Sequence, residues 1–370
     1  MQLTCNRALF SAAFSLAASA VPSRTPKDVL KNVLLSVSPS GVELIGTDQE
    51  MGVRCNVNGV TTASSGEALL PTARLASILR ELQDEFFTLD IQDQNITLRT
   101  GSSKFRLSSE DAQEFPPVAS FADLDFFRVP ASVFRSMIRR TSFATDTEST
   151  RYALGGLLLE FAAGSVTLVA TDSRRLAVAT AACEAIGTPE IPVRTTVVPT
   201  KAMGLLERSI DPTAEFVDIA VHDNDVLMRS GSCTIASRLV EGRFPRYKDV
   251  IPPGGTYRIP LAVGPFFSAV RQSQIVTDED SRGVDFSFAE SMLTLSSVAS
   301  TVGDSQIQIP IDFPHPEVRI TFDPRFVSEF LRVLPAESTV DLQLTDSDTA
   351  AVFRVEESYT YVVMPLTQSR

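Results

Sequence analysis

Apolar residues gather into short runs separated by turns through much of the chain, and one stretch shows this most clearly. Two apolar runs, 154–161 and 166–170, are joined by a short turn, and a third run begins at residue 176. Runs of this length bounded by turn residues predict antiparallel strands. A polar corner, TDSRR at 171–175, precedes the third run. The ordinary interpretation is an Asx turn at Asp172 with two solvated arginines, and the alternative is a functional corner.

This pattern belongs to a unit that returns three times at a spacing of roughly 125 to 130 residues. Each unit has an amphipathic helix, a hairpin, a second helix introduced by proline in its first turn, and a closing pair of strands. The first helices start near Cys5, Val129 and Ile259, and the second near Leu69, Val197 and Thr321. The hairpins start at Gly41, Ser165 and Ser291, and the closing strands at Ile96, Val226 and Ala351. The third hairpin lacks the Thr-Asp pair of the other two.

The repeat predicts an α+β chain of three helix/antiparallel-sheet domains rather than a doubly wound parallel sheet. A length of 370 residues agrees with two to three domains. We place the domains at 1–121, 122–252 and 253–370, the second boundary lying in the PPGG linker. Apolar residues make up 44% of the chain, and with 23 Phe and no Trp the cores must rest on Phe, Leu and Val.

The apolar segment 8–21 imitates the core of a signal peptide. Ser11, Ser15 and Ser19 form a polar stripe at helical spacing, however, and the segment occupies the same place in its repeat as the internal helices. No apolar run reaches the ~18 residues that a membrane span requires. The four cysteines show no metal-ligand or disulfide spacing, so we predict neither a metal nor a cofactor and expect a reducing cytoplasm.

Motifs for several enzyme classes are absent. The sequence contains no H-E-x-x-H, P-loop or G-x-S-x-G motif. We expect His222 and His315, the only histidines, to be exposed loop residues. Asp48 and Asp172 occupy equivalent places in two different repeats, so we do not expect them to pair as hydrolytic carboxylates.

Charge is distributed unevenly along the chain. The net charge is −12, yet the six repeat helices together carry +7. The densest group is Arg135, Arg139 and Arg140, and further cations on the helices include Arg74, Arg80 and Lys201. If the helices share a face, that face is basic and suits phosphate contacts without sequence readout; the alternative is ordinary solvated helix faces.

Four motifs on this repeat resemble the bacterial replicative sliding clamp, the β subunit of DNA polymerase III. They are TDQEM at 47, RYALGGLLLE followed by ATDSRRLAV from 151, RLVEGRFPRYKDVIP from 238, and YVVMPL from 361. The resemblance covers the whole chain. It implies the DNA clamp fold, closing as a homodimeric ring of six domains around double-stranded DNA. It also implies a non-catalytic processivity factor that binds the polymerase and the clamp loader through short peptide motifs.

The resemblance further implies a peptide-binding groove built from three stretches. Its residues are Arg151, Leu154, Thr171, Ser173, Arg174, Arg175, Leu176, Pro245, Asp249, Val250, Ala350, Val362, Val363, Met364, Pro365 and Leu366. An apolar groove with a few polar groups suits peptide recognition, and methionine adapts to varied partners. Without the resemblance, residues 362–366 would be interpreted as the end of a core strand.

Family contacts with DNA carry over to Arg24, Tyr152 and Lys201, and those between subunits to Phe105 and Leu107 against Ile275 and Val276. Three departures from the family pattern affect the groove: Ser173-Arg174 replaces Gly-His, Asp249 replaces a basic residue, and the tail 367–370 differs. Altered charge at the rim leaves open a paralogue with a groove that no polymerase uses. An Asp-based hydrolase is the second alternative.

Overall fold

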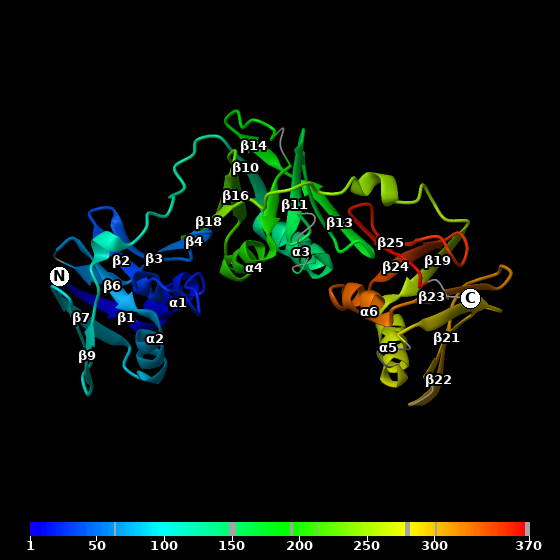
Figure 1. Ribbon diagram of the computed structural model, residues 1–370, viewed down its shortest axis with the longest axis horizontal. Coiled ribbons are helices and arrows are strands. Elements are labelled where there is room, and N and C mark those ends of the chain that lie inside the picture. Colours follow the sequence, from blue (N-terminus) through cyan, green and yellow to red (C-terminus); the bar gives the residue numbers. More distant parts are fainter. Residues whose placement is uncertain are drawn as a thin grey trace. The chain divides into compact units, whose positions relative to one another are not determined.

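The computed structural model describes residues 1–62, 64–146, 148, 153–192, 195–211, 213–277, 282–299 and 302–366. The chain forms two compact units, each built from separate segments of the sequence. Figure 1 labels their helices and strands. Unit 1 comprises Met1–Phe134, Cys183–Arg194 and Lys201–Leu239, and unit 2 comprises Arg135–Ala182, Thr195–Thr200 and Val240–Arg370.

The described residues of unit 1 form a five-stranded and a nine-stranded antiparallel sheet. The first has the order β5 (Val60–Thr62), β1 (Gln2–Asn6), β7 (Phe86–Gln92), β8 (Asn95–Arg99) and β9 (Lys104–Ser108). The second has the order β14 (Glu184–Ile186), β10 (Phe126–Pro130), β16 (Phe216–Val221), β17 (Asp225–Ser230), β18 (Cys233–Arg238), β4 (Met51–Asn56), β3 (Gly41–Thr47), β2 (Asn32–Ser38) and β6 (Gly66–Pro71). Helices α1 (Arg7–Ala18) and α2 (Thr72–Glu81) contact each other, and α1 packs on β3 and β4.

Unit 2 repeats this arrangement with an eight-stranded and a four-stranded sheet. The first has the order β15 (Val197–Pro199), β11 (Gly156–Ala162), β12 (Ser165–Thr171), β13 (Arg175–Ala182), β26 (Tyr359–Val363), β25 (Ala351–Val355), β24 (Thr339–Leu344) and β19 (Tyr257–Ala262). The second has the order β22 (Gly303–Pro310), β21 (Met292–Ala299), β20 (Val284–Ala289) and β23 (Val318–Phe322). Helices α5 (Val263–Ser273) and α6 (Pro324–Arg332) contact each other.

The two remaining α-helices each follow a strand directly in the chain. Two α-helices are α3 (Ala131–Thr141) and α4 (Thr200–Ser209), and the 3₁₀ turns are η1 (Asp28–Lys31), η2 (Ala112–Glu114), η3 (Ser142–Ala144), η4 (Tyr247–Val250) and η5 (Gln274–Val276).

Two strand pairs carry the sheets from one sequence repeat into the next. In unit 1, β4 of the first repeat pairs with β18 of the second, and in unit 2, β13 of the second repeat pairs with β26 of the third. The second repeat therefore contributes strands to the sheets of both units. The α+β class with antiparallel sheets is confirmed, while the domain boundaries near residues 121 and 252 stay predictions.

The predicted helices are present, but they begin later than the pattern indicated. The first helices start after strands β1, β10 and β19, which take up the first residues of each predicted segment. Among the second helices of the repeats, proline lies in the first helical turn at Pro324, whereas Pro71 is the N-cap of α2 and Pro199 ends β15. The fixed φ of proline suits the end of a strand as well as the first turn of a helix. Proline therefore marked the boundary between strand and helix without showing on which side of it the residue lies.

Helix α1 shows how the repeat buries its apolar face. Phe10, Ala13, Phe14 and Ala17 recur at helical spacing and are buried, each phenylalanine contributing about 1.5–3 kcal/mol. The helix approaches β3 so closely that a Cβ added to Gly46 would lie 2.0 Å from the carbonyl oxygen of Ala17. Most of segment 8–21 thus belongs to a packed helix of the first repeat, as predicted, and the helix ends at Ala18.

Candidate functional site

The polar corner between β12 and β13 is a tight turn held by its own side chains. The Oδ1 atom of Asp172 accepts hydrogen bonds from the backbone N–H groups of Arg174, at 2.9 Å, and Arg175, at 3.0 Å. The Thr171 hydroxyl donates to the carbonyl oxygen of Arg175 at 2.6 Å. Ser173 adopts a φ of 74°, which is rare for residues other than glycine. The predicted Asx turn is confirmed.

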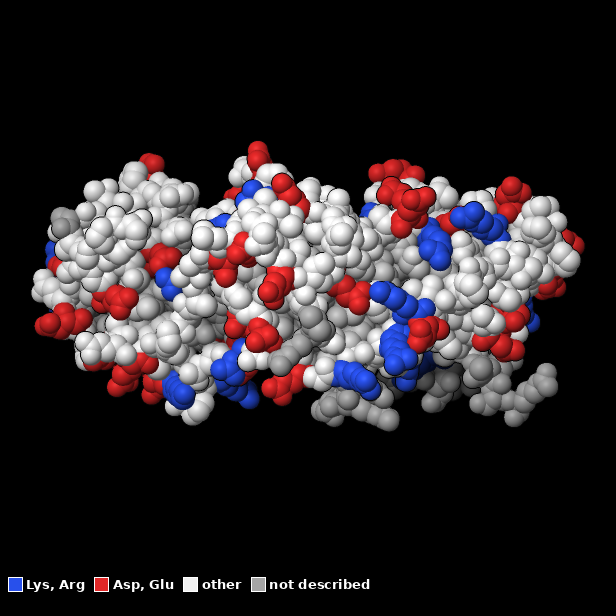
Figure 2. Space-filling view, turned by 90° about the horizontal axis from the view of Figure 1, so that it is seen from above, with Lys and Arg blue, Asp and Glu red and all other residues white. Residues whose placement is uncertain are grey.

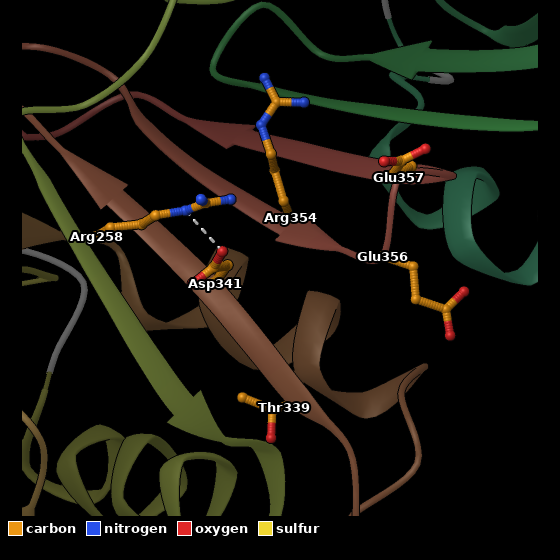
Figure 3. A pocket seen from close by; sticks show the side chains of 6 residues that line it. All are labelled: Arg258, Thr339, Asp341, Arg354, Glu356 and Glu357. Carbon is orange, nitrogen blue, oxygen red and sulfur yellow. Dashed lines mark ion pairs between the residues drawn. The ribbon is translucent and has the colours of Figure 1, made fainter.

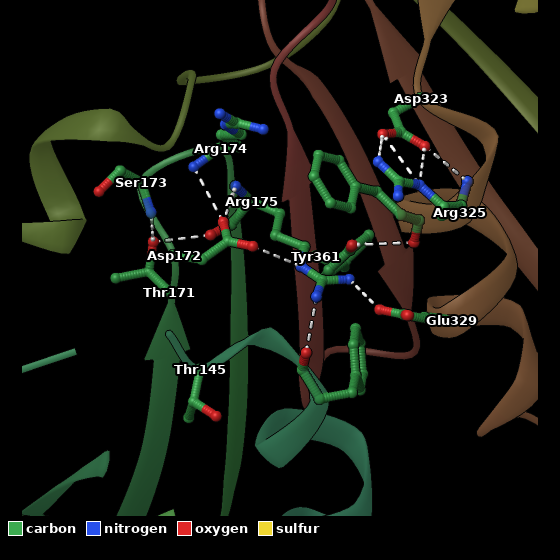
Figure 4. A network of polar contacts seen from close by, with 12 residues as sticks. Thr145, Thr171, Asp172, Ser173, Arg174, Arg175, Asp323, Arg325, Glu329 and Tyr361 are labelled. Carbon is green, nitrogen blue, oxygen red and sulfur yellow. Dashed lines mark hydrogen bonds and ion pairs between the residues drawn. The ribbon is translucent and has the colours of Figure 1, made fainter. Parts of the chain in front are cut away.

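Arg175 is not solvated, in contrast to the ordinary interpretation of the corner. Its side chain is 9% exposed, and its guanidinium donates to Asp172 Oδ2 at 2.9 Å, to the Phe143 carbonyl at 2.7 Å and to Glu329 of α6 (Figure 4). The guanidinium also lies over the ring of Phe326, 4.6 Å from its centroid.

The charge of this buried guanidinium is fixed by its surroundings. Burial opposes the cation, but Tyr361, Glu329 and Asp172 outweigh it and raise the pKa of Arg175 above its usual value. Arg175 therefore stabilises the contact between the corner, η3 and α6 within unit 2.

Two of the three predicted groove stretches meet through strand pairing. Leu176 lies opposite Val362, and Arg175 lies opposite Val363. Because side chains alternate between the faces of a sheet, Leu176 and Val362 share one face while Arg175 and Val363 leave from the other. Arg175 and Val363 therefore lie on the face opposite Leu176, and Arg175 reaches α6; that all three line one groove stays a prediction.

The third predicted stretch, which contains the GRFPRYKDV motif, packs on an apolar cluster that includes Leu176 and Val362. Phe244 and Tyr247 pack there with both residues, and Tyr247 donates its hydroxyl hydrogen to Glu160 at 2.6 Å. The buried members are Ala153, Leu158, Val169, Leu176, Val197, Phe244, Tyr247, Val352 and Val362, and Ala350 packs against them. Phe244 and Tyr247 were not predicted as site residues, although the GRFPRYKDV motif contains both.

The other predicted groove residues differ in how far their side chains are exposed to solvent. Val250 is 57% exposed, Met364 48% and Leu366 39%, whereas Leu154 is buried. Ser173, Arg174 and Asp249 are exposed, and Pro245 and Pro365 are half-buried. The Met364 N–H donates to the carbonyl oxygen of Arg174 at 2.9 Å, which fixes the last strand against the corner. Arg151 and Tyr152 lie outside the described residues.

The first repeat contains a corner of the same geometry. Thr47 donates to the Met51 carbonyl at 2.7 Å, Asp48 Oδ1 accepts from the Met51 N–H at 2.8 Å, and Gln49 has a φ of 77°. Gly52 takes the place of Leu176, and a Cβ there would lie 2.4 Å from Cγ1 of Val118. The side chain of Val118 thus occupies the space that Leu176 fills in the second repeat.

The two aspartates considered as a hydrolytic pair are each engaged separately. Asp48 lies in unit 1 and accepts a hydrogen bond from Lys201 at 2.7 Å, and Asp172 lies in unit 2 and binds Arg175. The geometry therefore gives no support to the hydrolase alternative. Across the described parts of the chain, no cluster of three or more His, Cys, Asp or Glu side chains could hold a metal ion.

The predicted DNA-binding cations differ in how they are held. Arg24, Arg74 and Arg80 are exposed, the last two on the side of α2 away from buried Leu75 and Leu79. Lys201 is exposed but paired with Asp48.

Within the α3 group, Arg139 is exposed and Arg135 and Arg140 are half-buried. The Arg140 guanidinium lies over the Tyr359 ring, 5.4 Å from its centroid. On the face drawn in Figure 2, acidic and basic side chains are interspersed and neither sign covers the surface.

The four sheets are open, so the strand at each end of a sheet lacks a partner on one side within the described chain. Two of these end strands bear on the predicted subunit contact: β9, which carries the half-buried Phe105 and Leu107, and β22, which is contacted by η5. In η5, Ile275 is 75% exposed and Val276 is half-buried. Edge strands with apolar side chains are ready to pair with another chain.

A hollow of about 450 Å³ lies on the eight-stranded sheet, and its lining is charged, unlike the apolar cluster around Leu176 (Figure 3). Charged side chains dominate its lining, and Arg258 donates to Asp341 at 2.9 Å. It holds none of the predicted groove residues.

Both histidines are exposed, as predicted. The Nδ1 and Nε2 atoms of His222 lie 2.7 Å from Asp225 Oδ1 and 3.0 Å from Asp123 Oδ1. The hydrogen bond with Asp225, followed by that with Asp123, raises the pKa of His222 above its ordinary value. His222 thus links the end of β16 to the segment that precedes β10.

This pair of contacts predicts a pH-dependent contribution to stability. Because the folded-state pKa is raised, the contribution is fully present below the unfolded-state pKa of about 6.5 and is lost as the pH rises through the folded-state pKa. We expect His222→Gln to lower the thermal midpoint by only about 1–2 °C near pH 5.5, because the site is partly exposed. Wild type and variant should converge at alkaline pH in a series of thermal melts; parallel curves would contradict this assignment.

Comparison with known proteins identifies the class to which this fold and site belong. The three repeats, each with two helices and antiparallel sheet, define a three-domain DNA clamp. Family descriptions of the DNA polymerase III beta subunit match residues 1–119 as its N-terminal domain, 128–246 as its central domain and 248–367 as its C-terminal domain. The chain belongs to the family of DNA polymerase III beta subunits.

Individual relatives cover nearly the whole chain. The beta sliding clamp of Pseudomonas putida is 29% identical over 338 residues, covering 90% of this chain and 91% of the relative, and that of Escherichia coli K12 is 27% identical over 337 residues with the same coverage. The crystal structure of the Pseudomonas aeruginosa DNA polymerase III subunit beta has a TM-score of 0.90 at 28% identity and full coverage of both chains. A clamp from the same organism, with the same score and identity, was solved bound to griselimycin.

In the part of the chain that the structure describes, none of the helices combines the length and apolar character needed to cross a membrane.

Proposed function

We propose that this chain is a sliding clamp of the cytoplasm, which encircles double-stranded DNA as a homodimer and tethers the replicative polymerase. It has no catalytic role, and it also binds the clamp loader and repair proteins through the same groove. The observation that carries the proposal is the apolar cluster around Leu176 and Val362, with exposed apolar side chains at its margin, in a chain of the polymerase III beta family.

The groove chemistry favours a short extended peptide with apolar side chains. Leu176, Val362 and Tyr247 form a floor that is already packed, so binding requires little reorganisation. Val250, Met364 and Leu366 remain exposed beside it and lose water when an apolar side chain enters. The exposed Arg174 and Asp249 carry opposite charges at the rim and orient the polar ends of the ligand.

Two of the sheet edges offer a route to ring closure. In the proposed dimer, β9 of one chain meets β22 of its partner, and Phe105 and Leu107 pack against Ile275 and Val276. Two such heterologous contacts close a ring of two chains. Arg24, Arg74, Arg80, Arg135, Arg139, Arg140, Tyr152 and Lys201 are the proposed contacts with DNA phosphates. Such contacts permit sliding, and encirclement then prevents dissociation.

The groove is tested by introducing a charge at its margin. Met364→Asp should weaken binding of a fluorescent peptide, copied from the clamp-binding C-terminal segment of the same organism's replicative polymerase, by at least about tenfold, or ~1.4 kcal/mol. The reason is that an aspartate must lose its hydration against an apolar ligand. Because Met364 is 48% exposed, the folded state should tolerate the change. Fluorescence anisotropy measures the affinity.

Leu124→Asp is the matched control, because Leu124 is an apolar residue of unit 1 that is 84% exposed. It should bind the peptide as tightly as wild type. Equal affinity of all three proteins would place the peptide elsewhere. If wild type itself fails to bind, the altered charges at Ser173-Arg174 and Asp249 favour the second candidate, a paralogous clamp whose groove serves other partners.

A further inference from the structure

Two cysteines from different repeats meet inside unit 1. Cys55 lies in β4 and Cys233 in β18, 178 residues apart in sequence, and their Sγ atoms are 2.7 Å apart. Both thiols are free, and their residues are 1% and 3% exposed. The sequence spacing gave no sign of this pair, because it depends on the register between two repeats.

The backbone register suits a covalent bond at this position. The Asn56 N–H donates to the Ser232 carbonyl and the Arg238 N–H donates to the Glu50 carbonyl, each at 2.9 Å. Hydrogen-bonded and non-hydrogen-bonded pairs alternate along antiparallel strands, so Cys55 and Cys233 form a non-hydrogen-bonded pair. Cα atoms in such pairs lie about 4.5 Å apart, within the range of disulfides of about 4.4–6.8 Å.

We propose that Cys55 and Cys233 are an oxidation site, at which a hydroperoxide converts the two thiols into an intrachain disulfide across the β4·β18 seam. One thiolate attacks a peroxide oxygen, the O–O bond breaks, and a sulfenic acid and one water result for hydrogen peroxide. The second thiol attacks the sulfenic sulfur and releases the second water. The two sulfurs together lose two electrons and two protons, which the peroxide accepts.

The surroundings determine how fast this reaction runs. Hydrogen bonding to Cys233, together with burial, raises the pKa of the Cys55 thiol, so Cys55 at rest is a poor nucleophile. However, Cys233 directly follows the exposed turn residues Gly231 and Ser232, and the exposed Asn56 follows Cys55. Local opening of this strand end gives a small oxidant access without global unfolding. The oxidation is accordingly slow and limited by opening.

The disulfide would join the first repeat to the second by a covalent bond. Because β4 and β18 are the strands that carry the nine-stranded sheet across this boundary, the bond prevents their separation. The seam between β13 and β26 contains no cysteine, so it would be unaffected. Oxidation therefore stiffens one junction between repeats and leaves the other unchanged.

The full-length protein is treated with hydrogen peroxide, alkylated with N-ethylmaleimide under denaturing conditions, and analysed by intact and peptide mass spectrometry without reduction. We expect the loss of two hydrogen atoms and of two alkylation sites, a linked peptide pair containing Cys55 and Cys233, and a thermal midpoint raised by several degrees. Dithiothreitol should reverse all three changes.

Cys183→Ser is the matched control, because Cys183 is the half-buried cysteine. It should form the same link at the same rate, whereas Cys55→Ser should lose it. Peptide mapping of wild type needs no variant, so a misfolded Cys55→Ser protein does not obscure the result. Overoxidation without a link, or links only through Cys183 or Cys5, would overturn the proposal.

Discussion

Replacing Arg175 with alanine should lower the free energy of unfolding by about 2–4 kcal/mol. The side chain is 9% exposed and connects Asp172, the Phe143 carbonyl and Glu329 within unit 2. Its removal leaves one carbonyl and two carboxylates, all partly buried, without their cation, and it removes the packing on Phe326. Thermal and denaturant unfolding, monitored by circular dichroism, measures the loss.

Arg174→Ala provides a matched control in the same turn. Arg174 is exposed, and its contact with Met364 uses the backbone carbonyl, which the substitution keeps. We expect a change within about 0.5 kcal/mol. Arg175→Lys should fall between the two, because lysine keeps the charge but cannot reach three acceptors in the fork geometry of arginine. If Arg175→Ala proves as stable as Arg174→Ala, the buried cation is not what holds the corner to α6.

Replacing Ile275 with aspartate should convert the proposed dimer to a monomer. Ile275 is 75% exposed in the chain, so the folded monomer should tolerate the change. In the dimer the carboxylate would be buried against Phe105 and Leu107 at both symmetric interfaces, weakening each by about two orders of magnitude or more. Sedimentation equilibrium should then report the chain mass of 40.2 kDa.

The same variant tests the topological account of DNA binding. Wild type loaded on a nicked circle should remain bound and should dissociate when the circle is cut, whereas Ile275→Asp should not be retained on either. Leu124→Asp is the matched control: it changes an exposed apolar residue outside both the proposed groove and the proposed interface, so it should stay dimeric and remain on the nicked circle. A dimeric Ile275→Asp protein, or equal retention of wild type on circular and cut DNA, would exclude the proposed ring.

Periodicity predicted most of the fold, because each repeat buries its apolar face locally. The strands around residues 154–180 and the existence of a helix within 5–21, found at Arg7–Ala18, follow from spacing alone. Helix starts were misplaced because proline suits both a strand end and a first turn, as Pro71 and Pro199 show. The four motifs identified the family, which no composition could do.

The sequence could not predict which side of a strand faces the groove, or how distant partners meet. Arg175 looked like a solvated turn residue because its partners Phe143 and Glu329 are far away in sequence. Val363 was assigned to the groove with its neighbours, yet strand alternation directs it to the opposite face. The pairing of Cys55 with Cys233 depends on a register that is set only when two repeats join one sheet.

The proposed groove is built on the seam where β13 of the second repeat meets β26 of the third. A peptide that contacts both sides of this seam binds only while the strands are paired, so its binding free energy adds to the work needed to separate them. The reciprocal effect must hold: any partner that pulls the two repeats apart lowers the affinity for peptide by the same factor. Peptide binding in the groove thus stabilises the junction between the second and third repeats against mechanical separation. Strain at that junction in turn lowers the affinity for the peptide.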